Sequence, residues 1–142
     1  MIEIREALGA GDLDAALALR REVFVGEQGV PEDDDIDGRD GEATHFVALD
    51  DGRVIATCRL LEADDRVRLG RLAVDRSARR RGLASALLAR AEQWARDRGA
   101  TEIVLAAQTD ARALYEQAGY VARGELFMEA GIEHVMMDKP LV

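Results

Sequence analysis

The fold of this 142-residue chain is decided by one stretch, Leu69-Gly70-Arg71-Leu72-Ala73-Val74-Asp75-Arg76-Ser77-Ala78-Arg79-Arg80-Arg81-Gly82-Leu83-Ala84-Ser85. Its largely apolar beginning, up to Val74, predicts a central strand. The residues after Gly82 begin the most regular helical pattern of the chain, because apolar side chains recur there at steps of three and four up to Ala95. Gly99 is a natural end for that helix. The stretch therefore predicts a strand, an arginine-rich turn and a helix.

Outward from this stretch, strand and helix patterns alternate, which favours an α/β fold with helices covering a sheet. Asp50-Asp51-Gly52 is a hairpin signal between the second and third strands, and Asp64-Asp65 makes a second turn into the fourth, so the first four strands are predicted to form an antiparallel meander. A first helix is expected to be capped by Asp12 or Asp14 and to run to about Val25, followed by an irregular loop over 26–41. A short helix is expected over 111–118. The predicted strands are 2–5, 45–49, 54–61, 67–74, 102–107, 120–125 and 132–138.

Composition limits the function classes. At this length a single domain over 1–142 is expected. The net charge of −9 argues against a general nucleic-acid binder, and no apolar run is long enough to span a bilayer. The single cysteine, Cys58, is expected to be a small buried side chain in a reducing compartment, so a cytoplasmic location is predicted. Residues 1–50 carry four basic and 14 acidic side chains, whereas 51–100 carry 12 and seven.

The arginine-rich turn has the features of an anion site. A helix N-terminus presents free N–H groups and partial positive charge. Gly82 permits a close approach of the backbone, Ala84 and Ser85 are small, and Arg79–Arg81 supply guanidinium donors. These features favour a diphosphate ligand. The alternative is a solvated surface run, since charge runs usually face water.

Two motifs make the chain recognisable. Arg79–Ala84 resembles the acyl-CoA signature [R/Q]-x-x-G-x-[G/A] of the GNAT acetyltransferase superfamily, and Ala111–Tyr120 resembles that superfamily's A-x-x-x-Y-E-x-x-G-[F/Y] helix. Phe24–Pro31 and Gly131–His134 are similar to a small bacterial and archaeal branch of it. The resemblance implies a GNAT-type fold, with about seven strands in a mixed, mainly antiparallel sheet that splays between the fourth and fifth strands.

The resemblance also implies roles for individual residues. Acetyl-CoA would be the co-substrate, and its acetyl group would pass directly to an amine. Tyr115 would protonate the leaving thiolate, although a purely structural core tyrosine is the alternative. The N–H groups from Arg80 through Ser85 would hold the pyrophosphate, with Arg79 or Arg80 near the 3′-phosphate. The implied acetyl-CoA-binding residues are Leu72, Ala73, Val74, Arg79, Arg80, Arg81, Gly82, Leu83, Ala84, Ser85, Gln108, Ala111 and Tyr115.

The sequence does not identify the general base of the reaction. Many relatives have Asn at the position of Gln108 and a carboxylate near Arg71. Glu27 is the leading candidate for contacting the acceptor amine, with a solvated loop glutamate as the alternative. His134 is either a base or substrate contact or a hydrogen-bonded strand residue, and His45 is expected to be structural.

The acidic run 33–37 lacks the spacing of a calcium loop, so a solvated acidic loop that attracts a cationic acceptor is expected, and no metal site. The predicted function is an acetyl-CoA-dependent N-acetyltransferase acting on a small primary amine. The alternative is a non-catalytic acyl-CoA-binding or regulatory module. No nucleic-acid or membrane partner is expected, and a homodimer is compatible with the resemblance.

Overall fold

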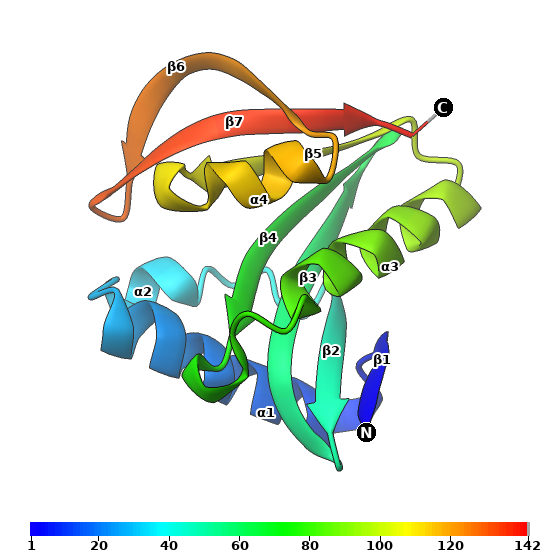
Figure 1. Cartoon of the computed structure of the whole chain (residues 1–142), viewed down its shortest axis with the longest axis vertical. Helices are drawn as coiled ribbons and strands as arrows, with labels where there is room; N and C mark the ends of the chain where they lie inside the picture. The colour runs from blue at the N-terminus through cyan, green and yellow to red at the C-terminus, as the bar shows by residue number, and fades with distance from the viewer. Residues whose placement is uncertain (142) are drawn as a thin grey trace.

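A computed structural model describes residues 1–141, in which seven strands form one mixed sheet (Figure 1). Their order across the sheet is β1-β2-β3-β4-β5-β7-β6. β4 and β5 are parallel, and all other neighbours are antiparallel. The strands are β1 (Ile2–Glu6), β2 (Thr44–Asp50), β3 (Arg53–Ala63), β4 (Arg66–Val74), β5 (Glu102–Gln108), β6 (Val121–Glu129) and β7 (Ile132–Pro140).

Helices cover both faces of this sheet. On one face α3 (Leu83–Asp97) packs mainly on β2, β3 and β4, and its Leu87 and Leu88 belong to the main buried core cluster. On the same face α4 (Arg112–Gln117) lies beside β5 (Figure 1). The other face is covered by α1 (Gly9–Arg20), η1 (Arg21–Glu27) and α2 (Glu32–Asp35). Two short 3-10 turns, η2 (Arg76–Ala78) and η3 (Thr109–Ala111), precede α3 and α4. No helix within 1–141 is long and apolar enough to cross a membrane.

The sheet splays at its centre, as the resemblance implied. β4 and β5 pair only where Arg66–Leu69 faces Glu102–Leu105. Beyond that point β4 continues to Val74 beside β3, and β5 continues to Gln108 beside β7, without pairing to each other. The facing edges of the two strands therefore carry backbone groups that the sheet does not use. This confirms the predicted fold class.

A bulge in β4 was not predicted. Thr57 lies opposite Ala73 and Arg59 opposite Gly70, so β4 has one more residue than β3 over this interval. Arg71 has a φ of 53°, in the left-handed region that non-glycine residues seldom adopt. A bulge bends its strand and increases the local twist. It therefore redirects the end of β4 at the point where β4 leaves β5.

The prediction for the first helix was partly wrong. The helix begins at Gly9, and Asp12 acts from inside the first turn, where its Oδ2 accepts a hydrogen bond from the Leu8 N–H at 2.8 Å. After Arg20 the α-helix changes into the π-helix η1, which has wider turns. π-helical turns are rare and often found at functional sites. Here the wider turn carries Glu27 to the splayed end of the sheet.

Other boundaries shift by a few residues because strand ends follow pairing that the sequence pattern does not show. The predicted loop over 26–41 contains the end of η1 and the short helix α2. The last strand pair is longer than expected, since β6 and β7 reach Glu129 and Pro140. Tyr120 was placed at the start of a strand but lies just before β6. Its ring is buried, and its hydroxyl donates to Glu92 Oε2 at 3.1 Å.

Candidate active site

The splay between β4 and β5 opens a cavity of about 850 Å³. It extends from the turn before α3, past the ends of β4 and β5, to the space between η1 and the β6–β7 hairpin. Most of the site residues predicted from sequence line this single cavity, and Arg81 is the exception. The lining members of that set are Glu27, Leu72, Ala73, Val74, Arg79, Arg80, Gly82, Leu83, Ala84, Ser85, Gln108, Ala111, Tyr115 and His134.

The N-terminus of α3 faces the cavity. Gly82 precedes the helix with a φ of 75°, and Arg80 also has a positive φ, of 65°. These two left-handed residues form a tight turn just before α3 begins. The N–H groups of Leu83, Ala84 and Ser85 have no partner inside the helix. Together with the positive end of the helix dipole, they form a cradle for an anion.

The three arginines of this turn are not equivalent. Arg79 uses its donors inside the protein: its Nε donates to the Val74 carbonyl at 3.1 Å, and Nη1 and Nη2 donate to Glu27. Arg81 contacts Asp50 Oδ2 at 3.3 Å, away from the cavity lining. Arg80 makes no ion pair with any residue of 1–141. Arg80 is therefore the guanidinium of this turn that remains available to a ligand in the cavity.

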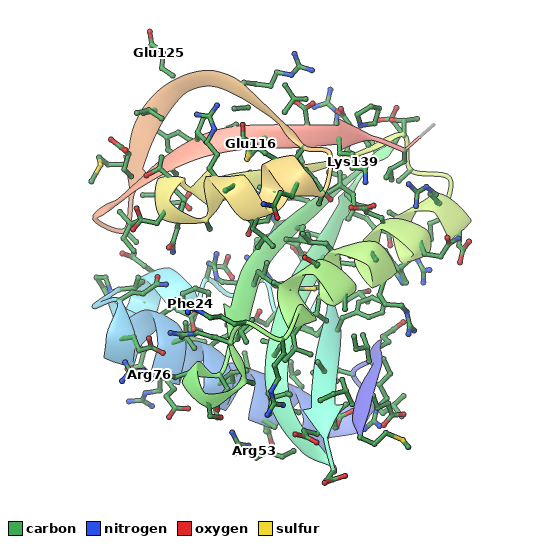
Figure 2. All side chains as sticks on the ribbon, viewed as in Figure 1. Phe24, Arg53, Arg76, Glu116, Glu125 and Lys139 are labelled. Atoms are coloured by element: carbon green, nitrogen blue, oxygen red, sulfur yellow. The ribbon has the colours of Figure 1, made fainter. Side chains whose placement is uncertain are left out.

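Glu27 lines the cavity but is neutralised by its neighbours. Its carboxylate is 2.6 Å from Arg79 Nη2 and 3.3 Å from Arg76 Nη2. In Figure 2, Arg76 lies beside the helical layer that ends in η1. Hydrogen bonding from Arg79, followed by that from Arg76, lowers the pKa of Glu27. The carboxylate therefore acts as a link between η1 and the turn before α3, and it is poorly suited to accept a proton.

Tyr115, from α4, lies where the two strands separate. Its ring is 7% exposed and packs edge-on against Tyr120, with ring centres 6.0 Å apart. Burial raises the pKa of the Tyr115 phenol to about 12, so the hydroxyl stays protonated at neutral pH. Its hydroxyl forms no hydrogen bond with the described residues. Cys58 is buried in the core nearby, and burial raises the pKa of its thiol to about 12, in line with a packing role.

Gln108 connects the end of β5 to the opposite layer. Its Nε2 donates to Gln28 Oε1 at 2.8 Å, although the two residues are 80 positions apart. This bond joins the residue after η1 to the strand end that borders the cavity. Gln28 was not singled out from the sequence, since an amide in a loop carries no distinct signal.

The acidic run was expected to be a solvated loop, and this is correct for Asp33 and Asp34, which are exposed, but wrong for Asp35. The Asp35 side chain is 2% exposed and pairs with Arg20 at 3.2 Å. Asp37 receives two hydrogen bonds from the Arg59 guanidinium, at 2.8 and 2.9 Å, which lower its pKa well below the usual range. Arg71 donates to the Asp35 backbone carbonyl at 3.2 Å. These pairs fix the α2 segment to the sheet, and they neutralise carboxylates that were expected to attract a cation.

The two histidines have different settings. The His45 ring is buried, and its Nε2 is 3.0 Å from the Asp40 carbonyl, as expected for a structural residue. His134 lies on β7 opposite Gln108 of β5 and lines the cavity. Its Nδ1 is 2.7 Å from the Ile132 carbonyl. From the sequence, His134 was either a base or substrate contact or a hydrogen-bonded strand residue. In the structure it lines the same cavity as Tyr115 and Gln108.

The splayed mixed sheet and the cavity beside the α3 N-terminus are those of the GNAT class of acyltransferases. The model of the acetyltransferase (GNAT) family matches residues 13–120. The chain therefore belongs to this family, and acyl-CoA is the group donor that the family uses.

Relatives and solved structures agree with this assignment. The uncharacterized N-acetyltransferase YjcF of Bacillus subtilis is 36% identical over 128 residues, which cover 89% of this chain and 91% of YjcF. An acyl-CoA N-acyltransferase from Pseudomonas aeruginosa superposes with a TM-score of 0.85 at 35% identity, covering 98% of both chains. PaiA N-acetyltransferase from Thermoplasma acidophilum, solved with coenzyme A, shares the fold with a TM-score of 0.78, 18% identity and 99% coverage of both chains.

Proposed function

We propose that this protein transfers the acetyl group of acetyl-CoA directly to a small primary amine, with both substrates bound at once. The observation that carries this proposal is the continuity of the cavity. It joins an anion cradle at one end to Tyr115 and the acceptor-side residues at the other. A donor and an acceptor can therefore meet inside one space without a covalent intermediate on the protein.

The residues fit the donor in three ways. The free N–H groups at the start of α3 and the Arg80 guanidinium suit a diphosphate. The unpaired edge of β4 over Leu72–Val74 suits the two amides of a pantetheine arm, which can bind as an added strand. Gly82 must keep its positive φ for the turn to present these groups.

Tyr115 is assigned as the acid of the reaction. A buried phenol that keeps its proton is a suitable hydrogen-bond donor to a thiolate that forms beside it. The thioester would lie between β4 and β5, next to Tyr115 of α4, the helix that packs on β5. Backbone N–H groups near Val74 would serve the developing oxyanion.

A thiol-release assay tests the proposal. Acetyl-CoA is incubated with the protein and a panel of primary amines, and free CoA is measured together with the acetylated amine. We expect amine-dependent release from at least one amine, with sequential kinetics. Saturable binding of acetyl-CoA without turnover on any amine would favour the alternative, a non-catalytic acyl-CoA-binding module.

The charges near the cavity bear on the choice of acceptor. The carboxylates of Asp35 and Asp37 are paired with arginines, so the charge of the first third favours a cationic acceptor less than the sequence suggested. We further propose that residues 1–142 act as a single domain, in the cytoplasm, without a nucleic-acid or membrane partner. A homodimer is compatible with this reaction and is tested by sedimentation.

A further inference from the structure

The hydrogen bond of His134 indicates which nitrogen of its neutral ring carries the proton. Its Nδ1 lies 2.7 Å from the Ile132 carbonyl oxygen, an atom that can only accept a hydrogen bond. The proton of the neutral imidazole is therefore on Nδ1, and Nε2 carries the free electron pair. A hydrogen bond of this kind is how proteins set which histidine nitrogen is available.

The ring is also held in place. It is stacked on Phe127 of β6, with ring centres 5.8 Å apart and an angle of 25° between the planes, and the side chain is 8% exposed. No residue of 1–141 forms a hydrogen bond with Nε2. The nearest carboxylate oxygen is Glu129 Oε2, at 3.8 Å. That distance is too long for a hydrogen bond, but close enough for the carboxylate to stabilise a positive charge on the ring.

The other candidate bases of the cavity are engaged. Glu27 is bound by Arg79 and Arg76, and the Asp37 carboxylate is bound by Arg59. Arg71 on β4 also lines the cavity, and a guanidinium is no base at neutral pH. Asp34 and Glu129 line the cavity at exposed positions, where water competes for a proton. Imidazole is the side chain best matched to proton transfer near neutral pH.

We propose that His134 is the general base that accepts the proton of the acceptor amine. This assignment deepens the proposed function and depends on it. As the amine nitrogen bonds to the thioester carbon, its proton passes to His134 Nε2. The carbon–sulfur bond breaks, and the thiolate takes the proton of the Tyr115 hydroxyl. His134 then releases its proton to solvent and Tyr115 regains one, so the net products are the N-acetyl amine and CoA.

The test uses acetyl-CoA with a panel of primary amines as acceptor, and it compares His134→Gln with Glu133→Gln. Glu133 is the neighbouring residue on β7 and is exposed, so its variant controls for a change in this strand. We expect His134→Gln to lower thiol release about 100-fold or more. We expect Glu133→Gln to stay within about twofold of the wild type, and calorimetry to give all three proteins the same affinity for CoA within about threefold.

Two further measurements separate a base from a structural residue. Added imidazole should restore part of the activity of His134→Ala, because it can occupy the space of the lost ring. Nitrogen-15 NMR of the wild-type histidines should show the neutral ring of His134 with its proton on Nδ1, a result that needs no variant to fold.

The outcomes are distinct. Thiol release by His134→Gln within threefold of the wild type, at unchanged CoA affinity, would overturn the role of His134 and leave the proposed function intact. A proton on Nε2 in the NMR experiment, or failure of imidazole to rescue a folded His134→Ala, would overturn it as well. A wild-type protein that binds no CoA, or binds it and releases no thiol with any acceptor, would overturn the proposed function itself and this assignment with it.

Discussion

The Arg79 guanidinium donates to both carboxylate oxygens of Glu27, with Nη2–Oε1 at 2.6 Å and Nη1–Oε2 at 3.0 Å. The two residues are 52 positions apart, and the pair ties the end of η1 to the turn before α3. It also distinguishes Arg79 from Arg80, which is free of ion pairs within 1–141. Two adjacent arginines of one motif therefore have different roles.

The first prediction follows from this difference. Arg80→Gln should raise the Kd for acetyl-CoA about tenfold, because it removes a charge-assisted contact to a phosphate. Arg79→Gln should change that Kd less than threefold, since its donors already bind Glu27 and Val74. Calorimetry on both variants measures the contrast. The reverse order of effects would contradict the geometry of this turn.

Gly82 should be indispensable for the donor. Gly82→Glu places a strained φ and a negative charge in the anion cradle, and it should reduce acetyl-CoA affinity more than 100-fold. Gly124→Glu is its matched control, because Gly124 has a similar φ of 77° and lies in β6, outside the cavity lining. Equal affinity in the two glutamate variants, measured by calorimetry, would remove the cradle from the CoA site.

Tyr115→Phe should lower kcat about 100-fold at an unchanged Kd for acetyl-CoA, because it removes the proton donor and keeps the ring. Tyr120→Phe serves as the contrast. It removes the hydrogen bond to Glu92 and should lower the free energy of unfolding by about 1–2 kcal/mol while kcat is retained. Steady-state kinetics and thermal unfolding give both quantities. If Tyr115→Phe turns over as fast as the wild type, Tyr115 is a core residue only.

The Asp37–Arg59 pair should make stability depend on pH. The pKa of Asp37 is lowered in the folded protein, mainly by the Arg59 hydrogen bond, so its contribution is present above the unfolded pKa of about 4. That contribution is lost as the pH falls from about 5 towards 2. Urea unfolding across this range should show a steep decline in the wild type and a shallower one in Asp37→Asn. Asp14→Asn, an exposed carboxylate without a partner among the described residues, should keep the wild-type slope.

The single lysine of the chain holds a buried acid. Lys139 Nζ donates to Glu92 Oε1 and to the Ala118 carbonyl, both at 2.8 Å, and Figure 2 places Lys139 near the end of α4. Lys139→Ala should lower the free energy of unfolding by about 3 kcal/mol, because the buried Glu92 carboxylate then keeps only the Tyr120 hydroxyl and the more distant Arg96, 4.0 Å away. The double variant Lys139→Met with Glu92→Met should recover most of that loss in chemical unfolding. A double variant no more stable than Lys139→Ala would show that the buried Glu92 charge is not the cause of the loss in stability.

Local patterns in the sequence predicted the strands, the helices and the anion cradle, and the family resemblance implied the splayed sheet and the acyl-CoA donor. Alternating apolar residues and hairpin signals predicted the strands, and the Arg79–Ser85 turn predicted a cradle at a helix N-terminus. Each of these features is formed by residues close together in the chain. The structure confirms the fold class that the resemblance implied, and the predicted donor residues line one cavity apart from Arg81.

The acceptor end could not be predicted in the same way. The π-helical turn before Glu27 and the bulge at Arg71 have no distinct sequence signal, because both depend on packing against other elements. Glu27 was predicted to contact the substrate amine, and nothing in the local sequence indicated that its carboxylate also binds two arginines. The acidic run was expected in solvent, and Asp35 is buried with Arg20.

The sequence by itself determined the sheet, the helices and the anion cradle, because periodicity, turn residues and helix ends act over a few neighbouring positions. Only the tertiary structure decided which charged groups are free. Ion pairs join residues tens of positions apart, so the formal charge of a segment does not tell which carboxylates or guanidiniums remain available. Within 1–141 Arg80 has no ion pair and His134 Nε2 has no hydrogen bond, so both are available to the proposed reaction.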